Sequence, residues 1–384
     1  RSHIKRFAER NIIALRAWYM RNPKLVDNEE IVANFVEGAL SNARFGTLPE
    51  NAQGSKLIFE AIVEDIEVKV DTFSKVSAVC DNEAFFFSNT SSIPIGMLAQ
   101  RSGIDGRLIG FHFYNPPAVQ KLIEIIPPEN IDPQLLSTAE EIAKRLNKII
   151  VFSKDVAGFI GNGHFMREIV FACQKVEMLR ASHSLCEAIY LVNKATQDFL
   201  IRPMGIFQLL DYVGLDVYQR IAQIMTQFLP GNNFFQKLIL DMIQTKIYGG
   251  QHQDGSQKDG FFHYERGHPA KIFDISTRSY ISIDEAWDKK LGPFPEGHRF
   301  WKHLAHDPDR LKLLHNYFQN LLHERTLGAE LAKDFLIDSS RIAALLVQEG
   351  VAKSIKDVDT VLENGFYHLY GANPTFIEMI RSSK

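Results

Sequence analysis

The pattern of apolar and polar positions changes twice along this chain of 384 residues. Residues 1–45 place apolar side chains at three- and four-residue intervals, which predicts two helices. Residues 57–155 alternate short apolar runs with amphipathic segments, a pattern typical of a parallel α/β sheet. Residues 156–384 contain long helical periods. We therefore predict an α/β domain with a parallel sheet, followed by all-α helical domains.

Polar residues and glycines mark the ends of the predicted helices. Asn28 is expected to cap the second helix, after a break at Pro23. Asp132 and Ser184 precede later amphipathic stretches and are expected to cap them in the same way. Gly214 is expected to interrupt another helix.

The C-terminal part contains a faint second copy of a helical pattern. Residues 341–379 parallel residues 175–211, because both show a helix, a short turn, a second helix, a Gly or Pro break and a hydrophobic helix. The polar stretch 249–267 is expected to be a loop at the end of the first copy. The expected domains are a partial α/β domain and two helical copies, the second of them degenerate: 1–155, 156–270 and 271–384.

Composition excludes several classes of protein. A hydrophobic content of 45% and a charged content of 23% are typical of a globular protein. The net charge of -3 gives no electrostatic footprint for nucleic acid, and no apolar run approaches the roughly 20 residues that span a membrane. Three cysteines without CxxC spacing predict buried thiols in a reducing compartment, a cytoplasm or a mitochondrial matrix. The histidines between residues 298 and 323 lack zinc-ligand spacing, so no metal is expected.

The most informative stretch is 107–127, which holds two strand-like runs separated by Pro116 and Pro117. If the runs fold back beside each other, His112 on the first meets Glu124 on the second, both facing an open cleft. An imidazole held by a carboxylate can act as a general base near neutral pH. The alternative interpretation is a core histidine with a glutamate at the rim.

Five segments, taken together, resemble the 3-hydroxyacyl-CoA dehydrogenase family in its long form, which duplicates the C-terminal helical domain. They occur in order over roughly 150 residues, with spacing that fits the family throughout. The matching segments are Glu60–Lys69, Ser88–Ser92, Gly110–Ile126, Lys154–Asn162 and Arg202–Asp216.

The resemblance implies a Rossmann-like domain and oxidation of (S)-3-hydroxyacyl-CoA to 3-oxoacyl-CoA in fatty acid β-oxidation. His112 matches the family's catalytic base and Glu124 the carboxylate that holds it. Ser91 matches the serine that hydrogen-bonds the reacting oxygen. Asn115 and Asn162 match asparagines around the substrate and the catalytic histidine.

The resemblance also implies that NAD is the cofactor, that acyl-CoA is the substrate and that the chain forms a homodimer through its helical domains. Glu64, Lys69 and Asn89 match positions that line the nicotinamide side, together with Ser91 and Asn115. Taken alone, Lys69 fits a solvated helix face as well as a binding role.

One expected motif is absent from the sequence. A dinucleotide-binding domain opens with a strand, a G-x-G-x-x-G turn and a helix, and nothing before Leu57 has this pattern. The stretch 158–163 orders its glycines as G-x-x-G-x-G and comes late in the sheet, so we do not predict a phosphate loop there. We favour a chain that lacks its first βαβ unit over a family member that lost it, because the loss leaves a long unpaired strand edge.

One departure from the family pattern and three alternative interpretations bear on this prediction. Gly161-Asn162-Gly163 stands where the family usually has Val-Asn-Arg, which weakens the helix start by roughly 1 kcal/mol per glycine. A catalytically silent homologue that serves as a binding or assembly protein is the alternative function. A hydroxyacid dehydrogenase acting on a free acid is disfavoured, because it needs a lysine at position 112. The basic cluster at residues 5–16 is either a solvated helix face or a contact for CoA phosphates.

Overall fold

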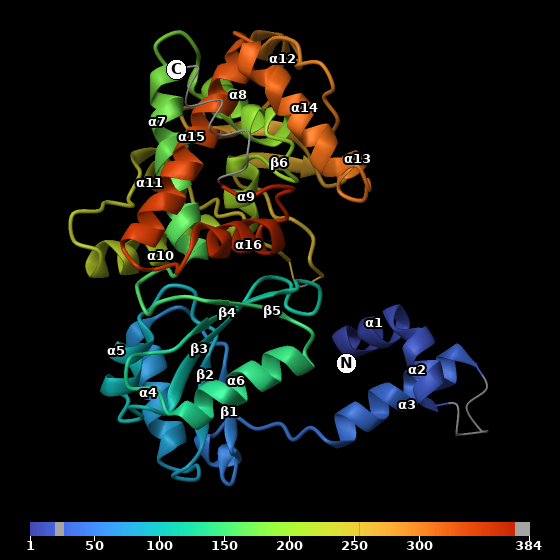
Figure 1. Ribbon diagram of the computed structural model, residues 1–384, viewed down its shortest axis with the longest axis vertical. Helices are drawn as coiled ribbons and strands as arrows, with labels where there is room; N and C mark the ends of the chain where they lie inside the picture. The colour runs from blue at the N-terminus through green and yellow to red at the C-terminus, as the bar shows by residue number, and fades with distance from the viewer. Residues whose placement is uncertain (20–26, 253, 373–384) are drawn as a thin grey trace. The chain divides into compact units, whose positions relative to one another are not determined.

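The computed structural model describes residues 1–19, 27–252 and 254–372, which divide into two compact units, Arg1–Gly54 and Ser55–Lys384. Figure 1 labels the elements of both. The first unit contains the helices α1 (Ser2–Arg10), α2 (Ile12–Tyr19) and α3 (Asn28–Ser41), followed by a short 3-10 turn η1 (Pro49–Ala52). Ala8, Leu15, Ile31, Val32 and Val36 form its small apolar core.

The capping prediction for α3 is wrong by one residue. Asp27, not Asn28, is the N-cap, because its side chain accepts a hydrogen bond from the Glu30 backbone N–H at 2.7 Å. The Glu30 side chain accepts one in return from the Asp27 N–H, which completes a capping box. Pro23, expected between the two helices, lies outside the described residues.

The second unit begins with a five-stranded sheet in the order β1-β2-β3-β4-β5. Three of its four pairings are parallel, and β3 and β4 pair antiparallel as a hairpin. The predicted parallel sheet is confirmed for three of the pairings, and the folding back of the two runs at residues 107–127 is confirmed by the antiparallel pair β3–β4. The strands are β1 (Leu57–Glu60), β2 (Phe85–Ser88), β3 (Leu108–Phe113), β4 (Leu122–Ile126) and β5 (Ile149–Phe152).

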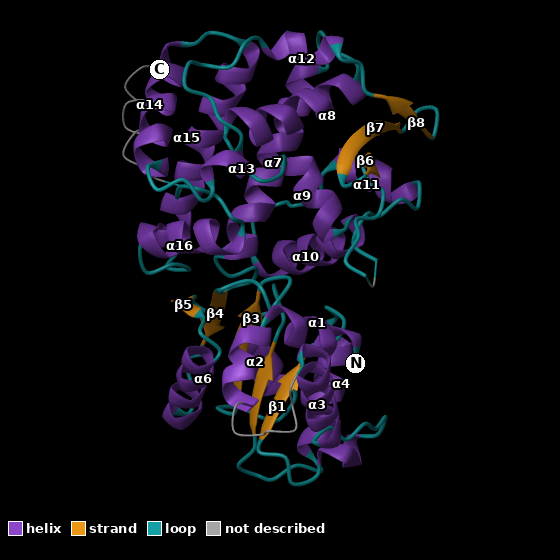
Figure 2. Ribbon diagram, turned by 90° about the vertical axis from the view of Figure 1, so that its right-hand side faces the viewer, coloured by secondary structure: helices purple, strands orange, loops and turns teal. Residues whose placement is uncertain are grey.

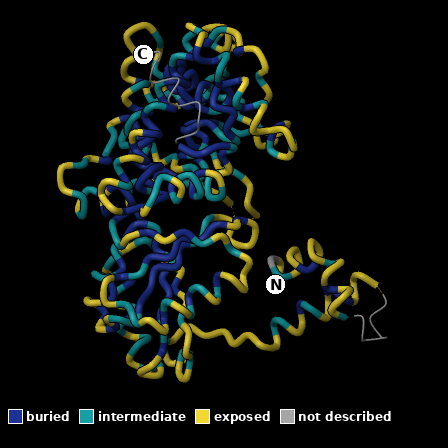
Figure 3. The backbone as a smooth tube through the Cα atoms, in the orientation of Figure 1, coloured by how far each residue is buried: buried dark blue, intermediate teal, exposed yellow. Residues whose placement is uncertain are grey.

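Helices cover the two faces of this sheet, and the alternation of side chains decides which residues each helix meets. Phe87, Phe111 and Ile125 pack against α6 (Pro133–Arg145) on one face. On the other face, apolar side chains such as Phe86 and Leu108 pack against α4 (Ile66–Ser77) and α5 (Ile95–Arg101). Figure 3 shows the sheet strands as mostly buried. The predicted cap Asp132 of α6 is confirmed, since its side chain accepts from the Gln134 N–H at 2.7 Å.

The rest of the second unit is mainly helical. Ser184 caps α8 as predicted, and Gly214, at a φ of 99°, ends α9 and begins α10 as predicted. The helices are α7 (Gly161–Leu179), α8 (Leu185–Lys194), the π-helical turn η2 (Ala195–Phe199), α9 (Ile206–Val213), α10 (Leu215–Phe228), α11 (Lys237–Gln244), α12 (Ala286–Leu291), α13 (Trp301–Leu304), α14 (Arg310–His323), α15 (Leu327–Gln348) and α16 (Ile355–Gly365).

A three-stranded antiparallel sheet interrupts these helices and was not predicted. It is formed by β6 (Phe262–Glu265), β7 (His268–Asp274) and β8 (Ser279–Ser282), in that order (Figure 2). The stretch 249–267, expected to be a loop, therefore ends in a strand. The domain boundary expected at residue 270 falls inside β7.

Two pairs of consecutive helices lie in the segments where the repeat was expected. The end of α15, a turn and α16 follow the same order as α7, a turn and α8. The long helices α7 and α15 pack side by side, and the Lys175–Asp334 ion pair at 2.6 Å joins them. The last part of the expected second copy, residues 373–379, lies outside the described residues. Across the described segments, no helix combines the length and apolarity required to cross a bilayer.

Candidate active site

His112 and Glu124 are directly opposed residues of the β3–β4 hairpin. Their side chains share the face of the sheet away from α6, and His112 Nδ1 lies 2.9 Å from Glu124 Oε2. Glu124 is fully buried, whereas the His112 side chain keeps 10% of its surface exposed. The structure thus confirms that the two residues meet. Of the pair, only His112 is accessible, so the expectation that both face an open cleft is wrong for Glu124.

The start of α7 explains how a carboxylate can be buried at position 124. The backbone N–H groups of Ile160 and Gly161 donate to Glu124 Oε1 at 3.0 and 3.3 Å. The Tyr114 hydroxyl donates to Glu124 Oε2 at 2.8 Å. A helix start attracts an anion, and an ionised carboxylate is an acceptor for all of these donors. The backbone at the start of α7 therefore binds the Glu124 carboxylate of the same chain.

A second carboxylate, that of the half-buried Glu64, organises the turn that follows β2. Glu64 Oε1 accepts hydrogen bonds from the hydroxyls of Thr90, Ser91 and Ser92 at 2.7, 3.3 and 2.7 Å. It also accepts the Ser91 backbone N–H at 3.0 Å. These contacts place Ser91 at the carboxyl end of the sheet, where ligands bind in open α/β folds.

Lys69 does not lie on a solvated helix face, because only 1% of its surface is exposed. Its Nζ donates to Glu60 Oε1 at 2.6 Å and lies 3.6 Å from Glu64 Oε2. Ser88 donates its hydroxyl to the other oxygen of Glu60 at 2.6 Å. The positive charge of Lys69 therefore compensates the negative charges of Glu60 and Glu64, next to the turn that contains Ser91.

The three predicted asparagines occupy different positions. Asn89 Oδ1 accepts the Phe113 N–H at 2.8 Å, which ties the end of β2 to the end of β3. Asn162 Nδ2 donates to the Ser91 carbonyl at 2.8 Å, which ties the start of α7 to the serine turn. Asn115 is exposed just beyond β3. The structure thus links Ser91 and Asn162 directly and leaves Asn115 at the surface.

Tyr114, Gly161 and Asp155 support the site, although none of them was predicted from the sequence to have a role. Asp155 accepts the backbone N–H groups of Ile95 and Gly96 at 2.6 and 2.7 Å, so it fixes the start of α5. Burial raises the pKa of Asp155. The sequence signal for Asp155 was its place in the KDVAGF segment, one of the segments that resemble the family. Its partner Ile95 lies 60 residues away in the chain, so the contact could not be predicted.

The residues at the carboxyl ends of β1, β2 and β3 suit the nicotinamide end of a dinucleotide. Glu64, Asn89 and Ser91 supply carboxylate, amide and hydroxyl groups within this small region. The G-x-G-x-x-G turn that commonly holds the pyrophosphate does not occur in the sequence.

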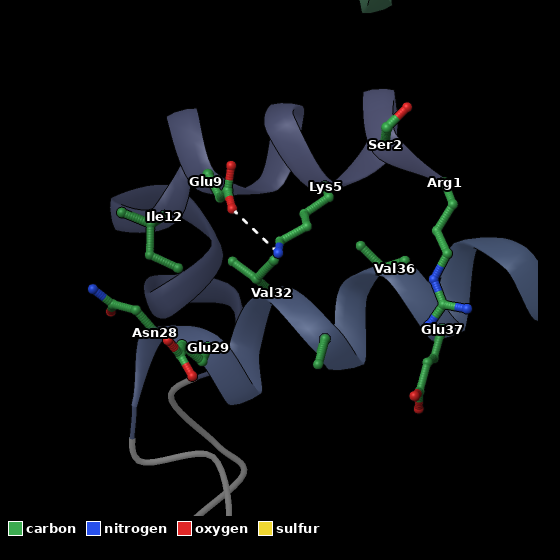
Figure 4. A pocket seen from close by; sticks show the side chains of 11 residues that line it. Arg1, Ser2, Lys5, Glu9, Ile12, Asn28, Glu29, Val32, Val36 and Glu37 are labelled. Carbon is green, nitrogen blue, oxygen red and sulfur yellow. Dashed lines mark ion pairs between the residues drawn. The ribbon is translucent and has the colours of Figure 1, made fainter.

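A cavity of about 920 Å³ lies in the first unit and contains none of these residues. It is lined by helices α1, α2 and α3, and Figure 4 shows the Lys5–Glu9 ion pair at 3.9 Å on its wall. Lys5, Arg6, Arg10 and Arg16 are exposed, which agrees with a solvated basic helix face.

Comparison with known families gives two consecutive matches. The 3-hydroxyacyl-CoA dehydrogenase NAD-binding domain matches residues 8–156, and the C-terminal domain of the same family matches residues 158–259. The first match places an NAD-binding domain in the part of the chain that holds the sheet.

Relatives agree with this assignment. The mitochondrial hydroxyacyl-coenzyme A dehydrogenase of Rattus norvegicus is 32% identical over 56% of this chain and 68% of its own length. A probable 3-hydroxybutyryl-CoA dehydrogenase of Deinococcus radiodurans is 30% identical over 58% and 78%. The peroxisomal bifunctional enzyme of Cavia porcellus is 33% identical, and the match covers 47% of this chain and 24% of that protein.

Solved structures show the same fold. M. tuberculosis FadB2 superposes with a TM-score of 0.53 at 29% identity, over 67% of this chain and 85% of that one. The 3-hydroxybutyryl-CoA dehydrogenase of Escherichia coli gives a TM-score of 0.60 at 19% identity, over 97% and 84%. With both halves of the family matched in order, the chain belongs to the 3-hydroxyacyl-CoA dehydrogenase family.

Proposed function

We propose that this chain catalyses the NAD-dependent oxidation of (S)-3-hydroxyacyl-CoA to 3-oxoacyl-CoA in fatty acid β-oxidation, with His112 as the general base. The observation that carries the proposal is the hydrogen bond between His112 Nδ1 and Glu124 Oε2. Because this bond occupies Nδ1, it leaves Nε2 as the nitrogen that can take a proton from the substrate hydroxyl. The names of the relatives from Rattus norvegicus and Deinococcus radiodurans support this substrate class.

The proposed roles divide the chemistry among four side chains. His112 Nε2 takes the proton of the 3-hydroxyl as the C3–H bond breaks. Glu124 compensates the positive charge that forms on the imidazole, and its bonds to the α7 start keep it in place. Ser91 donates to the reacting oxygen, and Asn162 holds the Ser91 backbone. The hydride that leaves C3 needs an acceptor, which is the chemistry that NAD supplies when bound.

The remaining predicted contacts belong to the same proposal. Glu64, Asn89 and Asn115 would contact the nicotinamide end, with Asn115 also near the substrate. Lys69 would act through Glu64 rather than by touching the cofactor, since it is enclosed.

The test is turnover by the purified full chain. We expect NADH to form with (S)-3-hydroxybutyryl-CoA and NAD, and acetoacetyl-CoA to be reduced with NADH. Absence of turnover in both directions, with a longer acyl chain also inert, would overturn the proposal and favour the silent homologue.

We further propose a homodimer through the helical domains, the division into domains at residues 155 and 270, and a cytoplasmic or mitochondrial-matrix location. The mitochondrial relative in Rattus norvegicus supports the last of these. A light-scattering mass of one chain in solution would contradict the dimer. Limited proteolysis that produces no cut near residues 155 or 270 would contradict the division.

A further inference from the structure

Tyr114 follows the last residue of β3, and its side chain lies on the same side of the hairpin as His112, because both meet Glu124. Its hydroxyl donates to Glu124 Oε2 at 2.8 Å, the same oxygen that lies 2.9 Å from His112 Nδ1. The two rings are 4.9 Å apart. One carboxylate oxygen therefore serves both the proposed base and a phenol.

Gly161 provides the space for this hydroxyl. A Cβ built on Gly161 would stand 1.9 Å from the Tyr114 hydroxyl oxygen and 3.3 Å from Glu124 Oε2. Any side chain at position 161 would force Tyr114 away from Glu124. Glycine is a poor residue for a helix start. The contact between Tyr114 and Glu124 explains why a glycine occupies position 161.

The end of α16 closes the other side of Tyr114. A Cβ on Gly365 would stand 2.7 Å from Tyr114 Cε1, and the Phe366 ring meets the tyrosine ring edge-on at 5.9 Å. Gln120 Nε2 donates to the Gly365 carbonyl at 3.2 Å, which anchors this end of α16 to the hairpin. Helix residues far along the chain thus fix the tyrosine against the catalytic carboxylate.

The tyrosine stays a donor under all ordinary conditions. Burial and the charge of Glu124 raise the pKa of Tyr114 well above its usual value. Glu124 is the charged group that acts on it, while α7 presents backbone N–H groups and α16 presents Gly365 and Phe366.

We propose that Tyr114 is a positioning residue of the active site. Its hydroxyl holds the Glu124 carboxylate, so that the negative charge of Glu124 is divided between the tyrosine hydroxyl and His112. Gly161 leaves free the space that the hydroxyl occupies. This inference rests on the proposed function. Without the hydroxyl, the charge on Glu124 acts more strongly on the imidazole and favours its protonated form. The base is then neutral only at higher pH.

The first test is Tyr114→Phe, which keeps the ring between α16 and α7. We expect kcat at neutral pH to fall about tenfold, KM for substrate and NAD to stay unchanged, and the acidic limb of the pH–rate profile to move to higher pH. Tyr317→Phe is the matched control, because the buried Tyr317 hydroxyl donates to the Phe199 carbonyl at 2.8 Å, away from the site. An unchanged profile in Tyr114→Phe would overturn the proposal.

The second test is a double-mutant cycle with Gly161→Ala, read by thermal unfolding. Alanine should destabilise the protein when Tyr114 is present. In the Tyr114→Phe background the contact with the hydroxyl oxygen at 1.9 Å is gone, while the contact with the ring Cζ at 3.0 Å remains. The loss should therefore be smaller in this background than in the unaltered chain. Equal losses in both backgrounds would show that Gly161 does not serve the tyrosine hydroxyl.

Nitrogen-15 histidine NMR separates this inference from the proposed function. The titration midpoint of His112 should be higher in Tyr114→Phe than in the unaltered chain, whether or not the chain turns over substrate. If the unaltered chain is inactive but the midpoint moves, the proposed function fails and the positioning role stands. If the midpoint is unchanged, the positioning role fails.

Discussion

The Ser91 hydroxyl donates to Glu64 at 3.3 Å, while the neighbouring Ser92 hydroxyl donates to the same oxygen at 2.7 Å. The Ser91 bond is long, so its hydroxyl can turn to a ligand at little cost. Ser92 is fully buried and has the shorter bond. The two adjacent serines therefore have separable roles.

Alanine at each serine tests this separation. Ser92→Ala leaves the half-buried Glu64 carboxylate with one donor fewer and should lower the free energy of unfolding by about 1–3 kcal/mol. Ser91→Ala should lower it by less than about 1 kcal/mol while reducing kcat by about tenfold or more. Urea unfolding and steady-state kinetics on both variants measure this. A Ser91→Ala enzyme with full kcat would remove Ser91 from the proposed mechanism.

Lys69→Met should destabilise the protein strongly. The substitution leaves Glu60 and Glu64 without their buried cation, and an uncompensated buried charge costs about 3–5 kcal/mol. Lys75→Met on the same helix is the control, because the Lys75–Asp71 pair is exposed and should contribute almost nothing. Equal melting temperatures for the two variants would contradict the buried network.

His164 should make the protein sensitive to mild acid. Burial lowers the pKa of His164 to about 4, and burial likewise lowers the pKa of His368 well below its usual value. Because the folded pKa lies below the unfolded one, the unfolded chain binds more protons between these values. Stability is therefore full above about pH 6.5 and decreases toward pH 4, by up to about 3 kcal/mol for His164.

His164→Gln tests the acid effect, since glutamine does not titrate and its amide nitrogen reaches about as far as His164 Nε2, which lies 2.9 Å from Ser339 Oγ. The free energy of unfolding should depend less on pH in this variant than in the unaltered chain. His323→Gln, at an exposed position, should change nothing. An identical pH dependence in all three proteins would contradict the assignment.

The sequence allowed the β3–β4 hairpin to be predicted because its physical causes are local. Two strand-like runs flank consecutive prolines, and alternation places His112 and Glu124 on one face once the runs pair. The caps Asp132 and Ser184 were predictable for the same reason, since each acts within three residues.

Contacts between segments that are distant along the chain could not be predicted from the sequence. Gly161 looked like a weakened helix start until the structure placed Tyr114 in the space of its missing side chain. The sheet β6–β8 was missed because β6 and β8 have four residues each, too few for their alternation to stand out beside helical patterns. Lys69 was predicted to line the nicotinamide side, with a solvated helix face as the alternative, because Glu60 and Glu64 surround it only in the folded chain.

The most direct test of the account is acetoacetyl-CoA reduction by His112→Gln. Glutamine fills similar space but cannot exchange a proton at neutral pH, so the rate should fall about a hundredfold to ten-thousandfold. The melting temperature and NADH binding should stay close to those of the unaltered chain. A folded His112→Gln protein that reduces acetoacetyl-CoA at an unaltered rate would contradict the assignment of His112 as the base.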